Sequence, residues 1–214
     1  MTVTLKLATS LDGRIATASG ESRWITGPQA REAVHRLRAE HDAVVVGIET
    51  ALADDPELTV RLPDFQGTQP GRVILDSRQR LPLTSRLAAT AREIPTYLIS
   101  AGPPVPRLVE MGVRVLQVEA SPGGHADLTD VLRALTAVGL SALFVEGGGQ
   151  VAASFLCSGL VDRLEWFRAP MIIGAEGRAG VGSLALAELS AAPRLKRVDL
   201  RELGPDVWER YERI

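Results

Sequence analysis

The sequence predicts an α/β fold with a mostly parallel sheet, and three observations support this prediction. Apolar runs at 42–47, 72–76 and 142–146 predict buried strands, and a continuous apolar run is typical of a strand covered on both faces. Segments with helical spacing of apolar residues alternate with these strands, which places helices on both faces of the sheet. Towards the C-terminus, extended segments at 161–169, 194–203 and 207–213 add an antiparallel end.

The chain opens with a strand and a polar loop. Apolar and polar residues alternate over 3–8, which predicts a strand with two distinct faces. Asp12 and Gly13 supply a tight turn, and 19–22 lengthen the loop with small polar groups. Trp24, followed by Ile25, is expected to re-enter the interior. The loop is therefore either an exposed connection anchored by a tryptophan or a holder for a polar, planar ligand.

A helix is expected to begin near Thr26 and to end at about Glu40. Thr26 as cap, Pro28 in the first turn and Gln29 three residues after the cap are typical of a helix start. Its apolar stripe is formed by Ala30, Ala33, Val34 and Leu37, and a basic stripe by Arg31, His35 and Arg38. A solvated surface is the simpler explanation of Arg31 and His35.

The middle of the chain continues the alternation. Acidic residues before Pro56 indicate an Asx turn that closes a short helix. The remaining elements are expected as follows: short helices at 48–53 and 106–111, loops at 62–71 and 120–126, an irregular segment at 79–95, strands at 96–100 and 113–118, and a helix at 127–138.

Three glycines follow the predicted strand at 142–146 and lead directly into an amphipathic helix. Gly147, Gly148 and Gly149 allow a phosphate to approach the backbone closely, and a helix N-terminus adds unpaired N–H groups and partial positive charge. The segment is therefore a candidate phosphate cradle. It does not match the G-x-G-x-x-G dinucleotide motif, and a glycine cluster by itself is a weak signal.

Composition limits the classes of partner and site. A net charge of −2 gives no general attraction to nucleic acid or membranes, so small molecules are the expected partners. Cys157 is the only cysteine and is expected in the core, so neither an internal disulfide nor a metal site is predicted. Without an apolar leader, linker or repeat, the chain is expected to be a cytoplasmic protein with a single domain at 1–214.

Three motifs resemble one enzyme family. The first thirty residues, together with LRAEHDAVVVG and TALADDPELTVR, are similar to the reductase domain of the bifunctional riboflavin-biosynthesis deaminase/reductase, over nearly the whole chain. The resemblance implies a dihydrofolate-reductase-like fold with about eight or nine strands and a C-terminal hairpin. It also implies that NADPH delivers hydride to C1′ of a ribosylamino pyrimidine 5′-phosphate. A homodimer is expected by analogy.

The resemblance also assigns site residues. Ser22, Arg38, Leu58 and Arg61 would hold the substrate phosphate, and Glu146 would read the pyrimidine, although a strand-end carboxylate can also simply cap the next helix. For the cofactor, the nicotinamide half would contact Ala8, Trp24, Thr50 and Asp54, the 2′-phosphate would contact Ser77 beside Arg78, and the pyrophosphate side would contact Gly147, Gly148, Gly149, Gln150, Val151 and Ser154.

Proton donation has two candidates. Asp54 is the first choice, because a partly buried carboxyl beside a nicotinamide can hold a proton near neutrality, and Lys6 on the first strand is the alternative. The deaminated uracil substrate is favoured, because the chain resembles the bacterial bifunctional enzymes more than the stand-alone reductases. Deaminase activity is expected from another chain or a missing N-terminal domain, since no zinc-deaminase motif is present.

Two other functions remain open at the level of sequence. The chain could be a non-catalytic NADPH-binding partner subunit, or another reductase of the same fold that acts on a different pyrimidine or pterin. The pair Arg38 and Arg61 favours a phosphorylated substrate over a folate.

Overall fold

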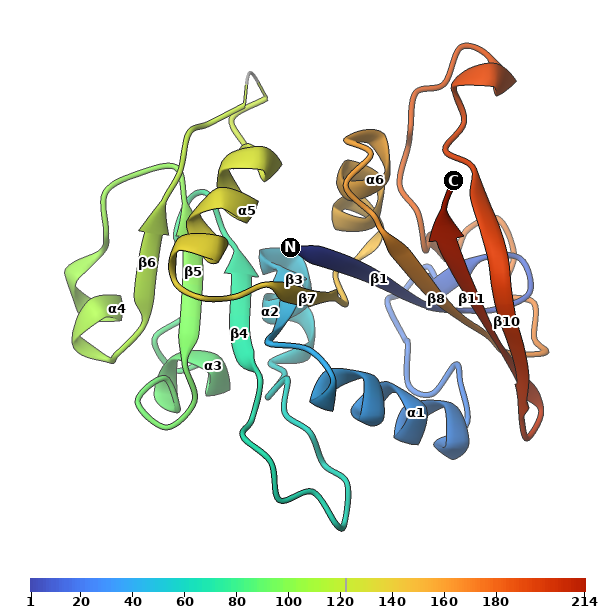
Figure 1. Ribbon diagram of the computed structural model, residues 1–214, viewed down its shortest axis with the longest axis horizontal. Coiled ribbons are helices and arrows are strands. Elements are labelled where there is room, and N and C mark those ends of the chain that lie inside the picture. Colours follow the sequence, from blue (N-terminus) through green and yellow to red (C-terminus); the bar gives the residue numbers. More distant parts are fainter. Residues whose placement is uncertain (122) are drawn as a thin grey trace. The chain divides into compact units, whose positions relative to one another are not determined.

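The computed structural model describes residues 1–121 and 123–214, and it confirms the α/β prediction (Figure 1). Pro122, in the predicted loop at 120–126, lies outside the described residues. The helices are α1 (Pro28–Ala39), α2 (Ile48–Asp54), α3 (Arg86–Ala89), α4 (Pro106–Glu110), α5 (Leu128–Ala137), α6 (Gly149–Cys157) and the 3₁₀ turn η1 (Leu189–Ala191). The strands are β1 (Thr2–Thr9), β2 (Arg14–Ala16), β3 (Ala43–Gly47), β4 (Gly71–Leu75), β5 (Thr96–Ser100), β6 (Arg114–Gln117), β7 (Ala142–Val145), β8 (Arg163–Arg168), β9 (Arg178–Ala179), β10 (Leu195–Leu203) and β11 (Asp206–Arg213).

Nine of the described strands form one sheet in the order β10-β11-β8-β1-β7-β3-β4-β5-β6. The pairs β3–β4, β4–β5 and β5–β6 are parallel, and β8 runs parallel to β1. Strand β11 pairs antiparallel with β8 and with β10, and a tight turn at Gly204 joins β10 and β11 as a hairpin. The predicted mostly parallel sheet with an antiparallel C-terminal end is therefore confirmed. The small sheet of β2 and β9 was not predicted.

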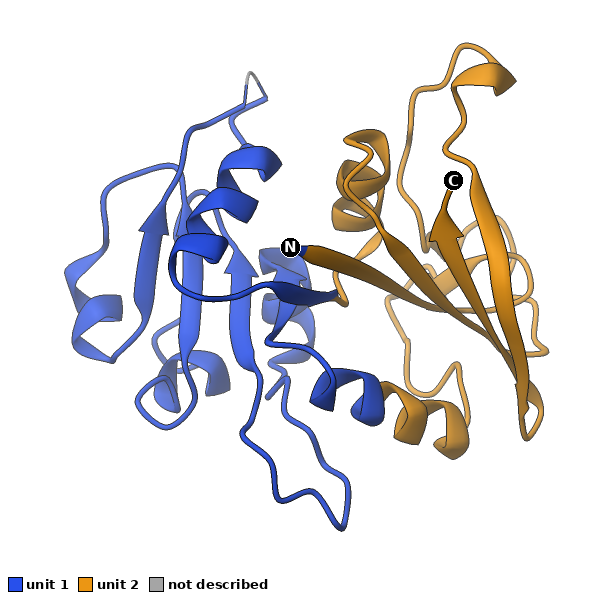
Figure 2. Ribbon diagram, in the orientation of Figure 1, with its two compact units in different colours: residues 1, 35–144 blue, residues 2–34, 145–214 orange. Residues whose placement is uncertain are grey.

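The chain divides into two compact units, shown in Figure 2. Unit 1 contains Met1 and residues 35–144, and unit 2 contains residues 2–34 and 145–214. Every residue of β3 and β5 is buried, as expected for strands that are covered on both faces. One core cluster of unit 1 joins these strands to α2, α3 and α4 through Val44, Val46, Ile48, Ala51, Ile74, Leu87, Leu98 and Leu108. The single domain over 1–214 stays a prediction.

A buried arginine organises the segment that the sequence predicted to be irregular. Arg72 is 1% exposed, and its guanidinium donates to the hydroxyl oxygens of Thr96, at 3.0 Å, and of Thr90, at 2.8 Å. It also donates to two backbone carbonyls, and burial lowers its pKa to about 10. Within the segment 79–95, helix α3 was missed by the sequence analysis; the Ser85 hydroxyl caps it by accepting from the N–H of Ala88.

Unit 2 buries a carboxylate in its antiparallel part. Glu165 on β8 is fully buried and accepts from Trp208 Nε1 at 2.7 Å and from Arg210 Nε at 2.6 Å. Burial raises the pKa of Glu165, and these two hydrogen bonds oppose the shift. The carboxylate therefore ties β8 to β11 on one face of the sheet, because a buried charge needs such partners.

The start of α1 differs from the predicted cap. The helix begins at Pro28, so the residue before it is Gly27 rather than Thr26. The N–H of Gly27 donates to the carboxylate of Asp206 at 2.6 Å, from the far end of the chain. A long-range acid thus satisfies this N–H, which no local sequence signal indicated. The predicted apolar stripe of the helix is confirmed, because Ala30, Ala33, Val34 and Leu37 are all buried.

Two predicted interior residues are on the surface. Trp24 is 66% exposed instead of buried, and the guanidinium of Arg31 lies 4.3 Å from the centre of its ring. A cation over the ring face replaces the apolar packing that was expected. Cys157 is also exposed and not in the core, because it ends α6, whose buried side is formed by Ala152, Ala153 and Phe155.

Candidate functional site

The chain after α2 turns sharply and presents part of the predicted site in unit 1. Asp55 ends the helix in the left-handed region, at φ 39°, and Leu58 is left-handed as well, at φ 56°. Leu58 is nevertheless 3% exposed, so it anchors the segment in the core. Asp54, the last residue of α2, is exposed. The burial that was assumed for its carboxyl is therefore wrong, whereas its role stays a prediction.

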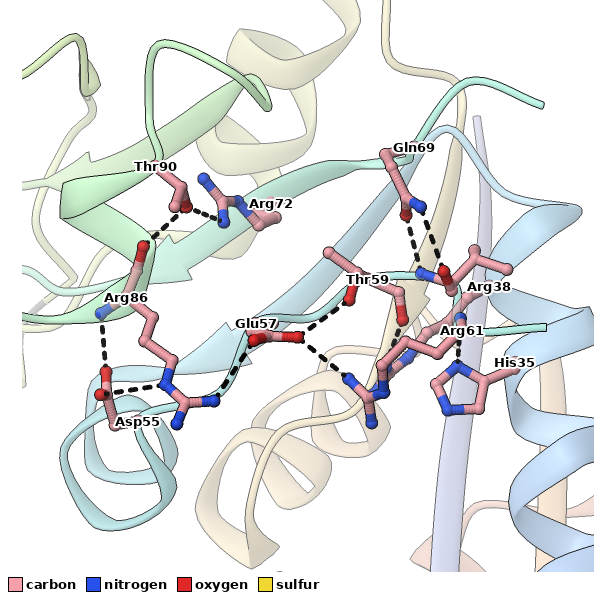
Figure 3. A network of polar contacts seen from close by, with 11 residues as sticks. His35, Arg38, Asp55, Glu57, Thr59, Arg61, Gln69, Arg72, Arg86 and Thr90 are labelled. Atoms are coloured by element: carbon pink, nitrogen blue, oxygen red, sulfur yellow. Dashed lines mark hydrogen bonds and ion pairs between the residues drawn. The ribbon is translucent and has the colours of Figure 1, made fainter. Parts of the chain in front are cut away.

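Four contacts fix the segment 59–61 (Figure 3). Arg38 Nη1 donates to the carbonyl of Thr59 at 2.8 Å, and the N–H of Arg61 donates to His35 Nδ1 at 3.2 Å. The side-chain amide of Gln69 accepts from the N–H of Val60 at 2.7 Å and donates to the carbonyl of Val60 at 3.1 Å. Arg61 thus lies on this braced segment, Leu58 directly precedes it, and Arg38 reaches it from α1. His35, expected on a solvated face, is part of this bracing instead.

A chain of charges lies along the same segment. Glu57 Oε2 is 3.7 Å from Arg61 Nη1, and Glu57 Oε1 accepts from Arg86 Nη1 at 3.3 Å. Arg86 Nε lies 3.7 Å from a carboxylate oxygen of Asp55, and the backbone N–H of Arg86 donates to the other oxygen at 2.9 Å. All four side chains are about half exposed, between 45 and 61%. The sequence analysis singled out neither Glu57 nor Arg86, because their contact joins residues 29 positions apart.

A second group of unit 1 surrounds the end of β4. The Ser77 hydroxyl accepts from the N–H of Ala126 at 2.9 Å, and Arg78 is exposed beside it. Gln79, at φ 52°, donates to the carbonyl of Pro103 and accepts from a nearby N–H, both at 2.7 Å. The two hydrogen bonds of Gln79 thus join the loop after β4, which carries the Ser77 hydroxyl and the Arg78 guanidinium, to the loop after β5. Thr50, on α2, is partly buried.

In unit 2, two of the three glycines are required by the packing of the chain itself. A Cβ on Gly147 would lie 2.6 Å from the side chain of Val151, and one on Gly149 would lie 2.4 Å from the carbonyl of Ala179. The space that the sequence analysis assigned to a phosphate is therefore filled at these two positions. Gly148 precedes α6 and gives it no side-chain cap, so backbone N–H groups form the start of this helix.

The other predicted residues of unit 2 lie on β1, on its following loop and on α6. Lys6 Nζ is 3.9 Å from Glu146 Oε2, and these side chains are 18% and 9% exposed. Ala8 lies two residues along β1 and therefore on the same face as Lys6. Ser22 is partly buried in the loop that also carries the exposed Trp24, Val151 is partly buried, and Gln150 and Ser154 are exposed on α6.

Asp12 closes the opening loop of unit 2 rather than acting alone as a turn residue. Its carboxylate accepts from the Ser10 hydroxyl at 2.5 Å and from the N–H groups of Ile173 and Gly174 at 3.1 and 2.8 Å. These hydrogen bonds, the one from Ser10 foremost, lower the pKa of Asp12 to about 2. Gly13, at φ 76°, provides the predicted tight turn.

Within residues 1–121 and 123–214, no three His, Cys, Asp or Glu side chains are grouped as metal ligands. Among the helices of the described part of the chain, none has the length and apolar character needed to cross a membrane.

Comparison with known proteins gives a consistent family match. A family model described as "RibD C-terminal domain" matches residues 1–208. Riboflavin biosynthesis protein RibD of Actinobacillus pleuropneumoniae is 35% identical over 213 residues, which cover 98% of this chain and 56% of that protein. The chain thus spans a little over half the length of such RibD relatives.

Two further matches differ in length. The 2,5-diamino-6-ribosylamino-4(3H)-pyrimidinone 5′-phosphate reductase of Methanothermobacter thermautotrophicus is 39% identical over 212 residues, which cover 98% of this chain and 96% of that protein. Among solved structures, RibD of Acinetobacter baumannii is similar with a TM-score of 0.87 and 34% identity, over 99% of this chain and 57% of that one.

Proposed function

Because this chain belongs to the RibD C-terminal domain family, we propose that it reduces 5-amino-6-(5-phosphoribosylamino)uracil to the ribitylamino product, with NADPH as hydride donor, in riboflavin biosynthesis. Relatives named RibD and a relative named as a pyrimidinone phosphate reductase support the proposal. The enzyme would be cytoplasmic and homodimeric, and a deaminase on another chain or on a preceding domain would supply its substrate.

The observation that carries the proposal is the braced segment of unit 1. The Arg38 guanidinium donates to the carbonyl of Thr59, and the backbone of Arg61, two residues along the same segment, is fixed by its N–H bond to His35. The Arg61 guanidinium itself lies 3.7 Å from Glu57. Guanidinium groups bind phosphate through paired charge-assisted hydrogen bonds, and fixing them in advance lowers the cost of ordering them on binding. Leu58 keeps the stretch in place from the core. We assign the substrate 5′-phosphate to these residues together with Ser22, and the pyrimidine edge to Glu146.

The residues present also fit NADPH, although by a different route from the one expected. The start of α6 has a glycine before it and no side-chain cap, so its backbone N–H groups suit a pyrophosphate. Gly147, Gly148, Gly149, Gln150, Val151 and Ser154 form this element. Ser77 and Arg78 suit a 2′-phosphate. When bound, the nicotinamide supplies a hydride, and Ala8, Trp24, Thr50 and Asp54 would line it.

A proton must also reach the nitrogen or the ring oxygen of the opening sugar. We assign this role first to Asp54, which is exposed at the end of α2. Lys6 is the alternative, because it is poorly exposed and its ammonium is held near a carboxylate of Glu146. An ammonium group can donate a proton to a nearby nitrogen or oxygen atom.

The non-deaminated pyrimidinone is the second candidate substrate. The Methanothermobacter relative, which is named for that substrate, is 39% identical, compared with 35% for the Actinobacillus RibD. These identities give no preference for the bacterial proteins, so the expected uracil form rests on the remaining resemblance alone. A non-catalytic NADPH-binding subunit or another pyrimidine or pterin reductase is disfavoured by the braced arginines, which suit a phosphorylated substrate.

The proposal is tested by following NADPH oxidation with four compounds: the uracil and the pyrimidinone, each with and without the 5′-phosphate. We expect turnover of the phosphorylated uracil, weaker turnover of the phosphorylated pyrimidinone, and a much higher KM for both ribosides. Turnover of the phosphorylated pyrimidinone that equals turnover of the phosphorylated uracil would support the second candidate substrate. NADPH binding without oxidation would make it a non-catalytic subunit.

A further inference from the structure

The carboxylate of Glu57 stands between two arginines, and only one of them belongs to the proposed phosphate site. Its Oε2 faces Arg61, and its Oε1 faces Arg86, as Figure 3 shows. A carboxylate and a phosphate are alternative ligands for the same guanidinium geometry. Glu57 therefore lies where an anion on Arg61 would otherwise be held.

The two contacts of Glu57 are not equal. The distance to Arg86 Nη1, 3.3 Å, is within hydrogen-bond range, whereas the distance to Arg61 Nη1, 3.7 Å, is that of an ion pair without a hydrogen bond. Glu57 also receives a weak hydrogen bond, at 3.5 Å, from the Thr59 hydroxyl. The contact with Arg61 is thus the easier of the two to exchange for a ligand.

Arg86 is itself fixed from the opposite side. Its backbone N–H donates to Asp55 at 2.9 Å, and its Nε lies 3.7 Å from the same carboxylate. This anchoring keeps its guanidinium beside Glu57. Without Arg86, the negative charge of Glu57 would face an incoming phosphate and would still pair with Arg61.

We propose that Glu57 is a stand-in anion for the substrate phosphate on Arg61, and that Arg86 takes up Glu57 when the phosphate binds; this inference rests on the proposed role of Arg61 in the function above. Glu57 orders the Arg61 side chain in the free enzyme and competes with the phosphate for it. Arg86 lowers that competition and touches no substrate atom. Glu57 and Arg86 are therefore residues that set the affinity for the phosphate.

The proposal predicts opposite effects for two conservative substitutions. Exposed ion pairs contribute about 0.2–1 kcal/mol, so each effect should be between about 1.4-fold and about fivefold. Glu57→Gln removes the competing charge and should lower both the KM for the phosphorylated substrate and the Ki for inorganic phosphate as a competitive inhibitor. Arg86→Gln keeps the backbone contact with Asp55 and should raise both constants. The value of kcat should not change in either variant.

The double variant separates positioning from direct contact. If Arg86 acts through Glu57, then Arg86→Gln should have no effect on KM in the Glu57→Gln background. The effects should also shrink at high salt, because these side chains are exposed. Asp130→Asn, which removes an ion pair with Arg133 on α5 of the same unit, is the matched control and should leave both constants unchanged.

Three results would overturn the inference. They are an unchanged or raised KM in Glu57→Gln, an equal loss of affinity from Arg86→Gln in both backgrounds, and a change in kcat without a change in KM. The Arg61→Ala variant distinguishes a failure of the proposed role of Arg61 from a failure of the inference on Glu57. If Arg61→Ala leaves KM for the phosphorylated substrate unchanged, the proposed role of Arg61 falls and the inference falls with it. If Arg61→Ala raises KM while Glu57→Gln does not lower it, only the inference falls.

Discussion

The two candidate phosphate sites are built in different ways. In unit 1, the charge comes from two side chains: Arg38, which donates to the backbone of Thr59, and Arg61, which pairs with Glu57. In unit 2, the start of α6 offers backbone N–H groups, and Gly147 and Gly149 are required because side chain and backbone atoms occupy their Cβ positions. A site made of side chains can be changed one charge at a time. A site made of backbone can be changed only through its packing.

The largest expected effect tests which unit supplies the proton. Asp54 lies in unit 1, whereas the alternative proton donor, Lys6, lies in unit 2. If Asp54 is the acid, Asp54→Asn should lower kcat by about 10²- to 10⁴-fold, because the shape is kept and the titrating proton is lost. Lys6→Met should then change kcat far less. The reverse order of the two kcat values would assign the proton to unit 2.

The next effect concerns substrate binding by side chains alone. Hydrogen bonds to charged groups contribute about 1.5–3 kcal/mol, so Arg61→Ala should raise KM for the phosphorylated substrate by about 10- to 100-fold. If the phosphate contact is equal in the ground and transition states, kcat should change little. Arg92→Ala, on the surface of the same unit, should leave KM unchanged. Loss of kcat in Arg61→Ala would place this arginine in the chemical step.

For the backbone site, the expected effect is on stability. Gly149→Ala would put a Cβ at 2.4 Å from the carbonyl of Ala179, which no flexible side chain can relieve. Overpacking of this kind costs about 1–3 kcal/mol in free energy of unfolding, measured by chemical denaturation. Gly102→Ala, where the nearest atom is at 4.0 Å, is the control and should be close to neutral. A fully stable Gly149→Ala protein would show that the close contact is not needed for the fold.

A smaller effect on binding than that of Arg61→Ala concerns the choice of cofactor. Ser77→Asp places a negative charge beside the proposed 2′-phosphate, and like-charge repulsion at a partly exposed position should weaken NADPH binding by about tenfold. The Kd for NADH should not rise, because NADH lacks that phosphate. Isothermal titration of both cofactors against the wild type and the variant measures this. An equal affinity of the wild type for NADPH and NADH would contradict the assignment of Ser77 and Arg78.

Local patterns predicted most of the fold. The strand at 96–100 and the hairpin of β10 and β11 agree with the structure because apolar runs and turn residues are local signals. Helix α3 was missed because its segment is organised by the distant Arg72. Trp24 was placed inside because a sequence does not show that Arg31 covers its ring.

The resemblance predicted residues of the braced segment, whereas the contacts that fix the segment were not predicted. The motif resemblance identified Arg38, Leu58 and Arg61, and the structure brings these three together. The motif resemblance does not identify Glu57 and Arg86, whose pairing depends on how the chain folds back after α2. It also misjudged the exposure of Asp54, because the end of a short helix can lie inside or outside.

The most direct test of the central claim follows the hydride itself. The protein is incubated with NADPH that carries deuterium at the transferred position of C4, together with the ribosylaminouracil phosphate, and the product is examined by mass spectrometry and NMR. The account predicts a ribitylamino product with a single deuterium on C1′ and one equivalent of NADP⁺. Oxidation of NADPH without deuterium in the product, or recovery of unchanged substrate and cofactor, would contradict it.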